Sequence, residues 1–77
     1  MNPPEPLDPL LETCVVYAAR YAHHRKTGAA LLVVDSIIAH WNQLSGSVKE
    51  TLVRESREAT TNPEDWERLR QHHITHP

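Results

Sequence analysis

AALLVVDSIIAHW, residues 29–41, is the stretch that decides the fold class of this chain. Its apolar residues continue past Asp35 and Ser36 to Trp41 at the spacing of a helix. A strand is the alternative for residues 31–34, because Val and Ile favour strands, but the sequence offers no second strand to pair with it. We therefore expect a helix from Ala30 to Gln43 that is apolar on most sides and buried.

A helix is also predicted before this stretch, from Pro9 to about Arg25. Asp8 is a preferred N-cap residue, and Pro9 suits the first helical position, where a missing N–H costs nothing. Gly28 is a typical residue just beyond a helix end. The apolar positions of this helix form one stripe with the 3.6-residue period. They are Leu10, Leu11, Cys14, Val15, Ala18, Ala19 and Ala22. We expect this stripe, including Cys14, to be buried.

Two shorter helices are predicted after the central stretch. Ser47 and Glu50 have the spacing of a capping box, which indicates a helix over residues 46–59. Asn62 is a second candidate N-cap, and it precedes a proline and two acidic residues that suit the positive end of a helix. The last helix is therefore expected over residues 63–72.

These elements predict an all-α fold, a small bundle of about four short helices. The Pro-rich residues 1–7 are expected to form a flexible arm, residues 8–73 a single helical domain, and residues 74–77 a disordered tail. With 77 residues, no Phe and an apolar share of 39%, the core is expected to be thin or completed by a second subunit. Trp41 and Trp66 are the expected core anchors.

Composition excludes several classes of protein. The formal net charge is −2, which is typical neither of a nucleic-acid binder nor of a strongly acidic DNA mimic. A single cysteine excludes an internal disulfide and suits a reducing compartment. No signal peptide is expected, because the N-terminus lacks a basic region before an apolar run, and no membrane span is expected, because the longest apolar run is far too short to cross a bilayer. We expect a soluble, cytoplasmic protein with no membrane partner.

No residue pattern indicates an enzyme, and neither a catalytic residue nor a cofactor is predicted. No triad or dyad can be assembled, and two glycines cannot supply a phosphate-binding loop. Asp35 is expected at a solvent edge or paired with Arg20 or Arg25. His72 and His76 have helical spacing that suits a metal, but structural zinc usually needs four ligands, so no metal site is predicted.

Nucleic-acid binding is the alternative that the sequence leaves open. The helices over residues 30–43 and 46–59, with their short connection, have the dimensions of a helix-turn-helix. The acidic side chains of the second helix would face phosphates, however, and they offset the positive charge of its Lys and Arg side chains. A better basic patch lies at the end of the first helix. It comprises Arg20, His23, His24, Arg25 and Lys26.

Several short stretches together resemble a pattern in small phage-encoded helical accessory proteins. These stretches are Arg20-Tyr21-Ala22, Arg25-Lys26-Thr27, Val34-Asp35 with Ile38 and Trp41, and Leu44-Ser45. The likeness covers residues 17–59 and the Asp65-Trp66 pair. It implies a protein of a phage or mobile element that acts in the cytoplasm of a bacterial host. Anti-CRISPR inhibitors, which occlude a surface of a CRISPR–Cas effector, are a prominent group of this size, so the expected partner is a host protein complex of this kind.

The resemblance brings no binding residues with it, so the expected contact surface rests on charge alone. Acidic side chains would meet basic residues if the target were a nucleic-acid channel. The candidate partner-binding residues are Arg20, Arg25, Lys26, Glu55, Glu58, Asp65 and Glu67. Assembly into a homodimer through the helix over residues 30–43 or the last helix remains a second expectation.

Overall fold

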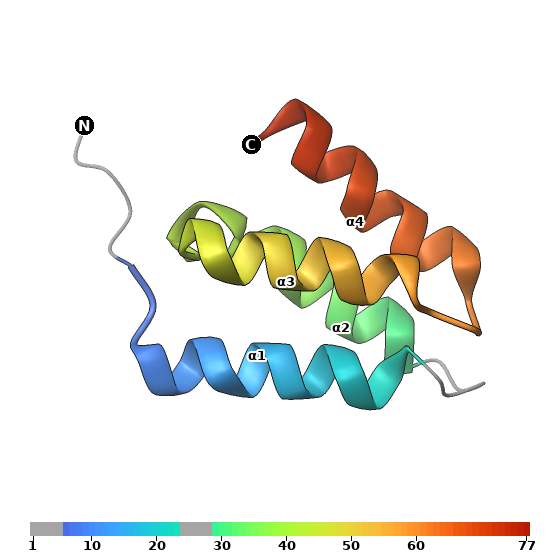
Figure 1. Cartoon of the computed structure of the whole chain (residues 1–77), viewed down its shortest axis with the longest axis horizontal. Coiled ribbons are helices and arrows are strands. Elements are labelled where there is room, and N and C mark those ends of the chain that lie inside the picture. Colours follow the sequence, from blue (N-terminus) through green and yellow to red (C-terminus); the bar gives the residue numbers. More distant parts are fainter. Residues whose placement is uncertain (1–5, 24–28) are drawn as a thin grey trace.

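The computed structural model describes residues 6–23 and 29–77, and the account below concerns these residues. They form four α-helices and one short 3₁₀-helix, with no strand among them. The α-helices are α1 (Pro9–Ala22), α2 (Ala29–Ala39), α3 (Gly46–Arg57) and α4 (Pro63–Thr75), and the 3₁₀-helix is η1 (Trp41–Gln43). The predicted all-α bundle is confirmed (Figure 1).

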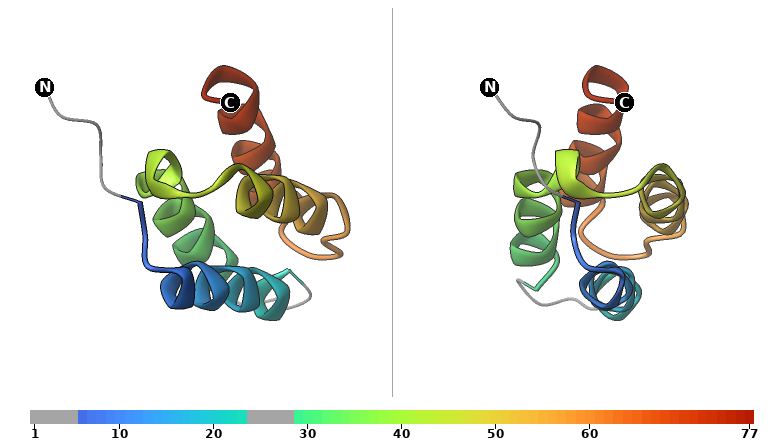
Figure 2. Two further views of the ribbon diagram at one scale, coloured as in Figure 1. Left: turned by 60° about the vertical axis from the view of Figure 1, so that its left-hand side comes forward. Right: turned by 90° about the vertical axis from the view of Figure 1, so that its left-hand side faces the viewer.

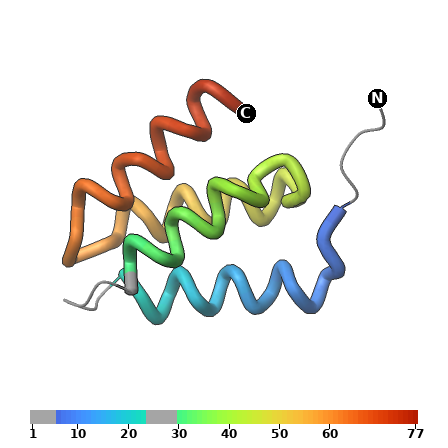
Figure 3. Tube along the Cα trace, turned by 180° about the vertical axis from the view of Figure 1, so that it is seen from behind, coloured from blue at the N-terminus to red at the C-terminus, as the bar shows by residue number. Residues whose placement is uncertain are grey.

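Each helix packs mainly against two others. Helix α1 contacts α2 and α3, and α4 contacts the same two helices from the other side. The right-hand view of Figure 2 shows the four helices at the corners of the bundle, with α1 and α4 at opposite ends. Figure 3, seen from behind, places α2 between α1 and α4. Both α2 and α3 therefore have one side toward α1 and another toward α4.

The core lies where the inner sides of the four helices meet. Its largest fully buried side chains are Trp41, Trp66, Leu52, Leu69 and Val34. Each described helix except η1 also contributes at least one small or aliphatic residue, so no single helix dominates the burial. The expectation that both tryptophans anchor the core is confirmed.

Helix α1 begins where the sequence predicts. The Asp8 side chain accepts a hydrogen bond from the Leu10 N–H at 2.8 Å, as an N-cap residue should. Just before it, the Leu7 N–H donates to the Gln43 carbonyl at 3.0 Å, and the Leu7 side chain packs on the core. Leu7 is therefore attached to the core, whereas the sequence predicted it to be part of a flexible arm. The helix ends at Ala22, and the predicted end at Arg25 lies outside the described residues.

The central apolar stretch differs from its prediction in two ways. First, the α-helix does not continue to Gln43 but ends at Ala39, and the chain continues as η1. The change occurs at His40, whose N–H donates to both the Ser36 and the Ile37 carbonyls. Second, it is not buried on most sides. Leu31 and Leu32 are exposed, Leu32 to 73%. The prediction was wrong because only α1 and α4 cover α2 closely, and they leave its outer side open.

The start of α3 corrects the predicted cap. Ser45 is the N-cap residue, and its hydroxyl accepts from the Val48 N–H, so the expected Ser47 and Glu50 capping box does not form. The Ser45 N–H instead donates to the Glu12 carboxylate of α1 at 2.7 Å. In a capping box, a side chain of the same helix accepts from the N–H of the N-cap residue. Here Glu12 of α1 takes that role, and the sequence pattern of α3 alone cannot predict a contact with another helix.

Helix α4 begins at Pro63 as predicted, but not for the predicted reason. Asn62 lies in the left-handed region (φ 52°, ψ 51°), and its side chain makes no cap hydrogen bond. The helix also continues to Thr75, beyond the predicted end at His72. Residues 74–77 are therefore not a separate tail, because the Trp41 indole N–H donates to the His76 carbonyl and attaches this end to the core.

Candidate functional site

An apolar groove runs between α1 and α2. Its main hollow has a volume of about 350 Å³ and takes its walls from both helices and from the segments before α1 and after α2. The residues lining it are Leu7, Leu11, Cys14, Val15, Ala18, Ser36, Ile37, His40 and Leu44. A second hollow of about 180 Å³ shares Val15, Ala18, Ser36 and Ile37 and adds Leu32 and Val33. We call the two together the α1–α2 groove.

Exposed leucines stand beside this groove on both helices. Leu11 belongs to its α1 wall and Leu32 to its α2 wall, and both side chains are exposed. Leu10 and Leu31 are exposed next to them in the sequence. Contiguous exposed apolar surface on a small domain typically marks an interaction site. The groove is therefore the strongest candidate for a binding surface on the described part of the chain.

The groove carries almost no charge. None of its lining residues is Asp, Glu, Lys or Arg, and its polar members are Ser36 and His40. One ring nitrogen of His40, Nδ1, already lies 2.9 Å from the Ser36 carbonyl oxygen. Phosphate backbones are bound chiefly by Lys and Arg side chains. The chemistry of this surface therefore suits an apolar protein segment and not a nucleic acid.

The groove also corrects the predicted burial of α1. The N-terminal half of the expected stripe is exposed, including Leu10, Leu11 and Cys14, while Ala19 and Ala22 are fully buried. The small side chains near the end of α1 belong to the core, whereas Leu11 and Cys14 of its first turns line the groove. Cys14 was expected to be an inert core residue, but it lines the groove and is accessible.

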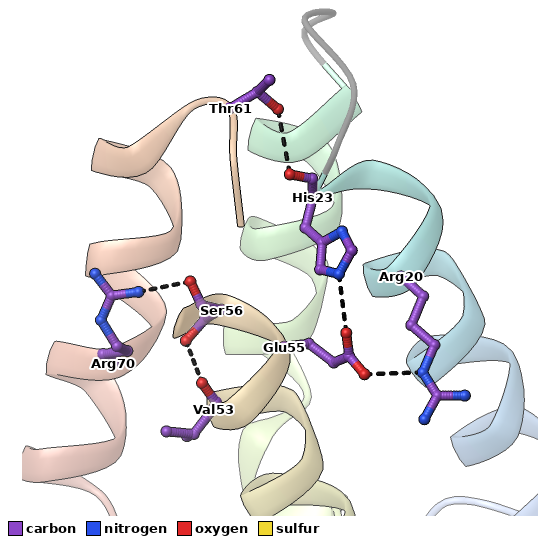
Figure 4. Close-up of polar contacts among 7 residues, drawn as sticks. All are labelled: Arg20, His23, Val53, Glu55, Ser56, Thr61 and Arg70. Carbon is purple, nitrogen blue, oxygen red and sulfur yellow. Dashed lines mark hydrogen bonds and ion pairs between the residues drawn. The ribbon is translucent and has the colours of Figure 1, made fainter. Parts of the chain in front are cut away.

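A polar cluster joins the end of α1 to α3 (Figure 4). The Glu55 carboxylate accepts from Arg20 Nε through one oxygen and faces His23 Nε2 through the other, both at 2.9 Å. Glu55 is 6% exposed and His23 4% exposed, whereas about half of the Arg20 side chain is exposed. The His23 carbonyl accepts from the Thr60 N–H and the Thr61 hydroxyl, which fixes the end of α1 to the α3–α4 connection.

The electrostatics of Glu55 follow from these contacts. Burial alone would raise the pKa of the Glu55 carboxyl, but the hydrogen bonds from Arg20 and His23 and their charges outweigh it and lower the pKa below its usual value. Glu55 is thus an ionised group held inside the chain. Nearby, Arg70 of α4 donates to the Ser56 carbonyl at 2.8 Å, so the same end of α3 is also held to α4 (Figure 4).

The structure places the predicted contact residues in different surroundings. Arg20 and Glu55 belong to the polar cluster, and Glu58 lies exposed beside it. Asp65 is half-buried on α4, and Glu67 is exposed there, paired with Arg70. Arg25 and Lys26 lie outside the described residues. The predicted contact surface therefore stays a prediction, and of its described members Arg20 and Glu55 are bonded to each other.

Asp35 is exposed, as the solvent-edge alternative predicts, but its partner differs from those predicted. It pairs with Arg68 of α4 at 2.6 Å, not with Arg20, and both side chains are about half exposed. The ion pair joins the outer side of α2 to α4. The sequence could not show this because Asp35 and Arg68 are distant in the chain.

The histidines at the end of α4 gather around Trp41. The rings of His72 and His73 meet the indole edge-to-face with centroids 5.7 and 5.6 Å away, and His72 stacks on His76 at 4.3 Å. Burial lowers the pKa of the His72 imidazole, and the nearby charge of His76 lowers it further. The Lys49 ammonium of α3 lies over the Trp41 ring, 5.6 Å from its centroid. These residues pack the last turn of α4 onto the core.

Sequence reasoning missed two functional features. The first is the burial of Glu55 and Ser56 on α3, since Glu55 was predicted only as a partner-binding residue. Their spacing from Leu52, three and four residues, was the available signal, because such positions share a helix face. The second is the groove, which had no sequence signal, since its apolar α1 and α2 residues were expected in the core and Leu7 in a flexible arm.

None of the described helices combines the length and the apolar character needed to cross a membrane. Comparison of the chain with models of protein families, with curated proteins and with solved structures finds no match.

Proposed function

We propose that this protein is a non-enzymatic binding protein that receives an amphipathic helix of a partner protein in the α1–α2 groove. The observation that carries the proposal is the groove's combination of exposed leucines with an uncharged lining. Apolar grooves between helices bind the apolar face of a partner helix through side chains that repeat at helical spacing.

The position of the groove between two helices supports a helix as the occupant. Its two hollows share four lining residues and so lie next to each other between α1 and α2. A partner helix placed along it would extend a two-helix wall into a three-helix layer, which is the ordinary packing of helical proteins. Leu11 and Leu32 would then lose their contact with water, and this burial would supply much of the affinity.

The more specific form of the proposal is a phage or mobile-element inhibitor of a host complex, with an anti-CRISPR protein acting on a CRISPR–Cas effector as the leading case. The resemblance of Arg20-Tyr21-Ala22 and the other quoted stretches to phage accessory proteins supports this form. Occupation of a helix-binding surface on an effector would block it sterically, without any chemical step. A DNA-cleavage assay with purified effector complexes measures such inhibition directly, and loss of inhibition in a groove variant would locate it.

Cys14 provides the test of the general proposal. It is the only cysteine of the chain, it is exposed, and it lines the groove. A photoreactive group attached to Cys14 should cross-link a partner protein from a bacterial host lysate, and Leu32→Glu should abolish the cross-link while the helical spectrum is kept.

The matched control carries the label elsewhere on the same fold. In a Cys14→Ser background, a cysteine replacing exposed Arg57 on α3 places the same group away from the groove lining. Equal capture from both positions, or capture that survives Leu32→Glu, would refute the groove as the binding surface. A cross-linked product of twice the chain mass would show that a second copy occupies the groove and would overturn the partner-helix proposal.

A further inference from the structure

A second candidate site lies at the end of α1, apart from the groove. A ring nitrogen of His23, one carboxylate oxygen of Glu55 and one of Glu58 all lie within 4.8 Å of one another. None of the three residues lines the α1–α2 groove. We propose that these three side chains bind a divalent transition-metal ion of the Zn²⁺ type.

The ligand types suit such an ion. Imidazole nitrogen and carboxylate oxygen are both ordinary zinc ligands, and three protein ligands leave a fourth position for water. Imidazole disfavours Mg²⁺ and Ca²⁺, which prefer oxygen ligands throughout. A site with one histidine and two glutamates therefore selects a transition metal over the hard cations.

The geometry needs only a small adjustment. Tetrahedral bonds of about 2.0–2.2 Å separate neighbouring ligand atoms by roughly 3.4 Å. His23 Nε2 and Glu55 Oε2 are already 2.9 Å apart, and because an ionised carboxylate only accepts hydrogen bonds, the ring nitrogen carries the proton between them. On metal binding this proton would leave to solvent, and the nitrogen lone pair would bind the ion. Glu58 is exposed at the end of α3, so rotation of its side chain can bring its oxygen into range.

Two of the ligands are held in place before any metal arrives. The burial of Glu55 and His23 fixes their side chains, and the His23 carbonyl is held by Thr60 and Thr61. Arg20 donates to Glu55 Oε1 and so leaves Oε2 as the oxygen directed at His23. Such outer contacts orient metal ligands in known sites. The guanidinium charge opposes the incoming cation, but two carboxylates outweigh it.

The experiment titrates ZnCl2 into the full chain by calorimetry. His72 and His76 are also stacked one helical turn apart and could bind zinc, so the titration uses a His72→Gln/His76→Gln background as well as the unmodified chain. We expect one zinc per chain in the double variant. Glu58→Gln in that background should weaken binding at least about 10-fold, because even outer-contact mutations cost that much in metal affinity.

The matched control is Glu50→Gln, which removes an exposed glutamate from the same helix away from the cluster. It should leave zinc affinity unchanged. In nitrogen-detected NMR spectra, the His23 imidazole signals should shift on adding zinc, whereas adding Mg²⁺ at the same concentration should not shift them. The proposal is overturned by any of three results: no saturable zinc binding in the double variant, equal affinity of Glu58→Gln and Glu50→Gln, or equal competition by Mg²⁺.

Discussion

The replacement Glu55→Gln tests whether the polar cluster of Arg20, His23 and Glu55 stabilises the fold. Gln has nearly the same shape as Glu but no charge, so the change removes the charge-assisted hydrogen bond with His23 without opening a cavity. A hydrogen bond to a charged group contributes about 1.5–3 kcal/mol to stability. The contact with Arg20 is not counted, because that side chain is half exposed and water screens it.

We therefore expect Glu55→Gln to lower the free energy of unfolding by about 2 kcal/mol. In a domain of this size, that loss would lower the melting temperature by roughly 8–16 °C. Thermal and urea unfolding followed by circular dichroism, in the presence of a chelator, measures both quantities. Glu50→Gln is the control, because an exposed glutamate on the same helix should change stability by less than about 0.5 kcal/mol.

The pH dependence provides a second readout of the same cluster. The pKa of Glu55 lies below its usual value of 4.5 in the folded chain, so its contribution is present above that value and is lost as the pH falls through the folded pKa. The unmodified chain should therefore lose more stability between neutral and acidic pH than Glu55→Gln does. Equal stability of Glu55→Gln and Glu50→Gln at neutral pH, with parallel acid profiles, would refute this account of the cluster.

Three further predictions concern the core, a helix cap and the groove. Trp41→Phe and Trp66→Phe remove similar volumes from fully buried positions, but of the two only Trp41 donates its indole N–H to an acceptor among the described residues. Trp41→Phe should therefore be the more destabilising by about 1 kcal/mol in urea unfolding, and equal costs would contradict the role of that hydrogen bond. Asp8→Ala should lower stability by about 1 kcal/mol through loss of the α1 cap, whereas Asp8→Asn should restore most of it. Leu32→Ser should change the unfolding free energy by less than about 0.5 kcal/mol, because its side chain is largely exposed, yet it should reduce partner capture in the Cys14 cross-linking assay.

The helices themselves could be predicted from local sequence. Asp8-Pro9 and Pro63 begin α1 and α4 where expected, because N-capping and the fixed φ of proline act over a few residues. The choice of helix over strand for residues 31–34 was also correct, since the apolar spacing continued to Trp41. N-caps, prolines and apolar spacing act between residues that are close in the chain, so the sequence alone is enough to recognise them.

The burial of each face could not be predicted in the same way. An apolar stripe indicates which side of a helix avoids water but not whether another helix is available to cover it. Leu11, Cys14 and Leu32 were expected in the core, and they form a groove instead, because α3 and α4 pack on other sides of α1 and α2. The contact of Glu12 with Ser45 could not be predicted for the same reason, because it depends on how α1 packs beside the start of α3.

The amino-acid sequence by itself determined an all-helical chain, its helix starts and its two tryptophan anchors, because each depends on short-range backbone and side-chain preferences. Only the tertiary structure decided which apolar side chains remain in contact with water, and it alone brought His23, Glu55 and Glu58 together. Those features depend on the relative placement of helices, which is set by the packing of the whole core and not by any one segment.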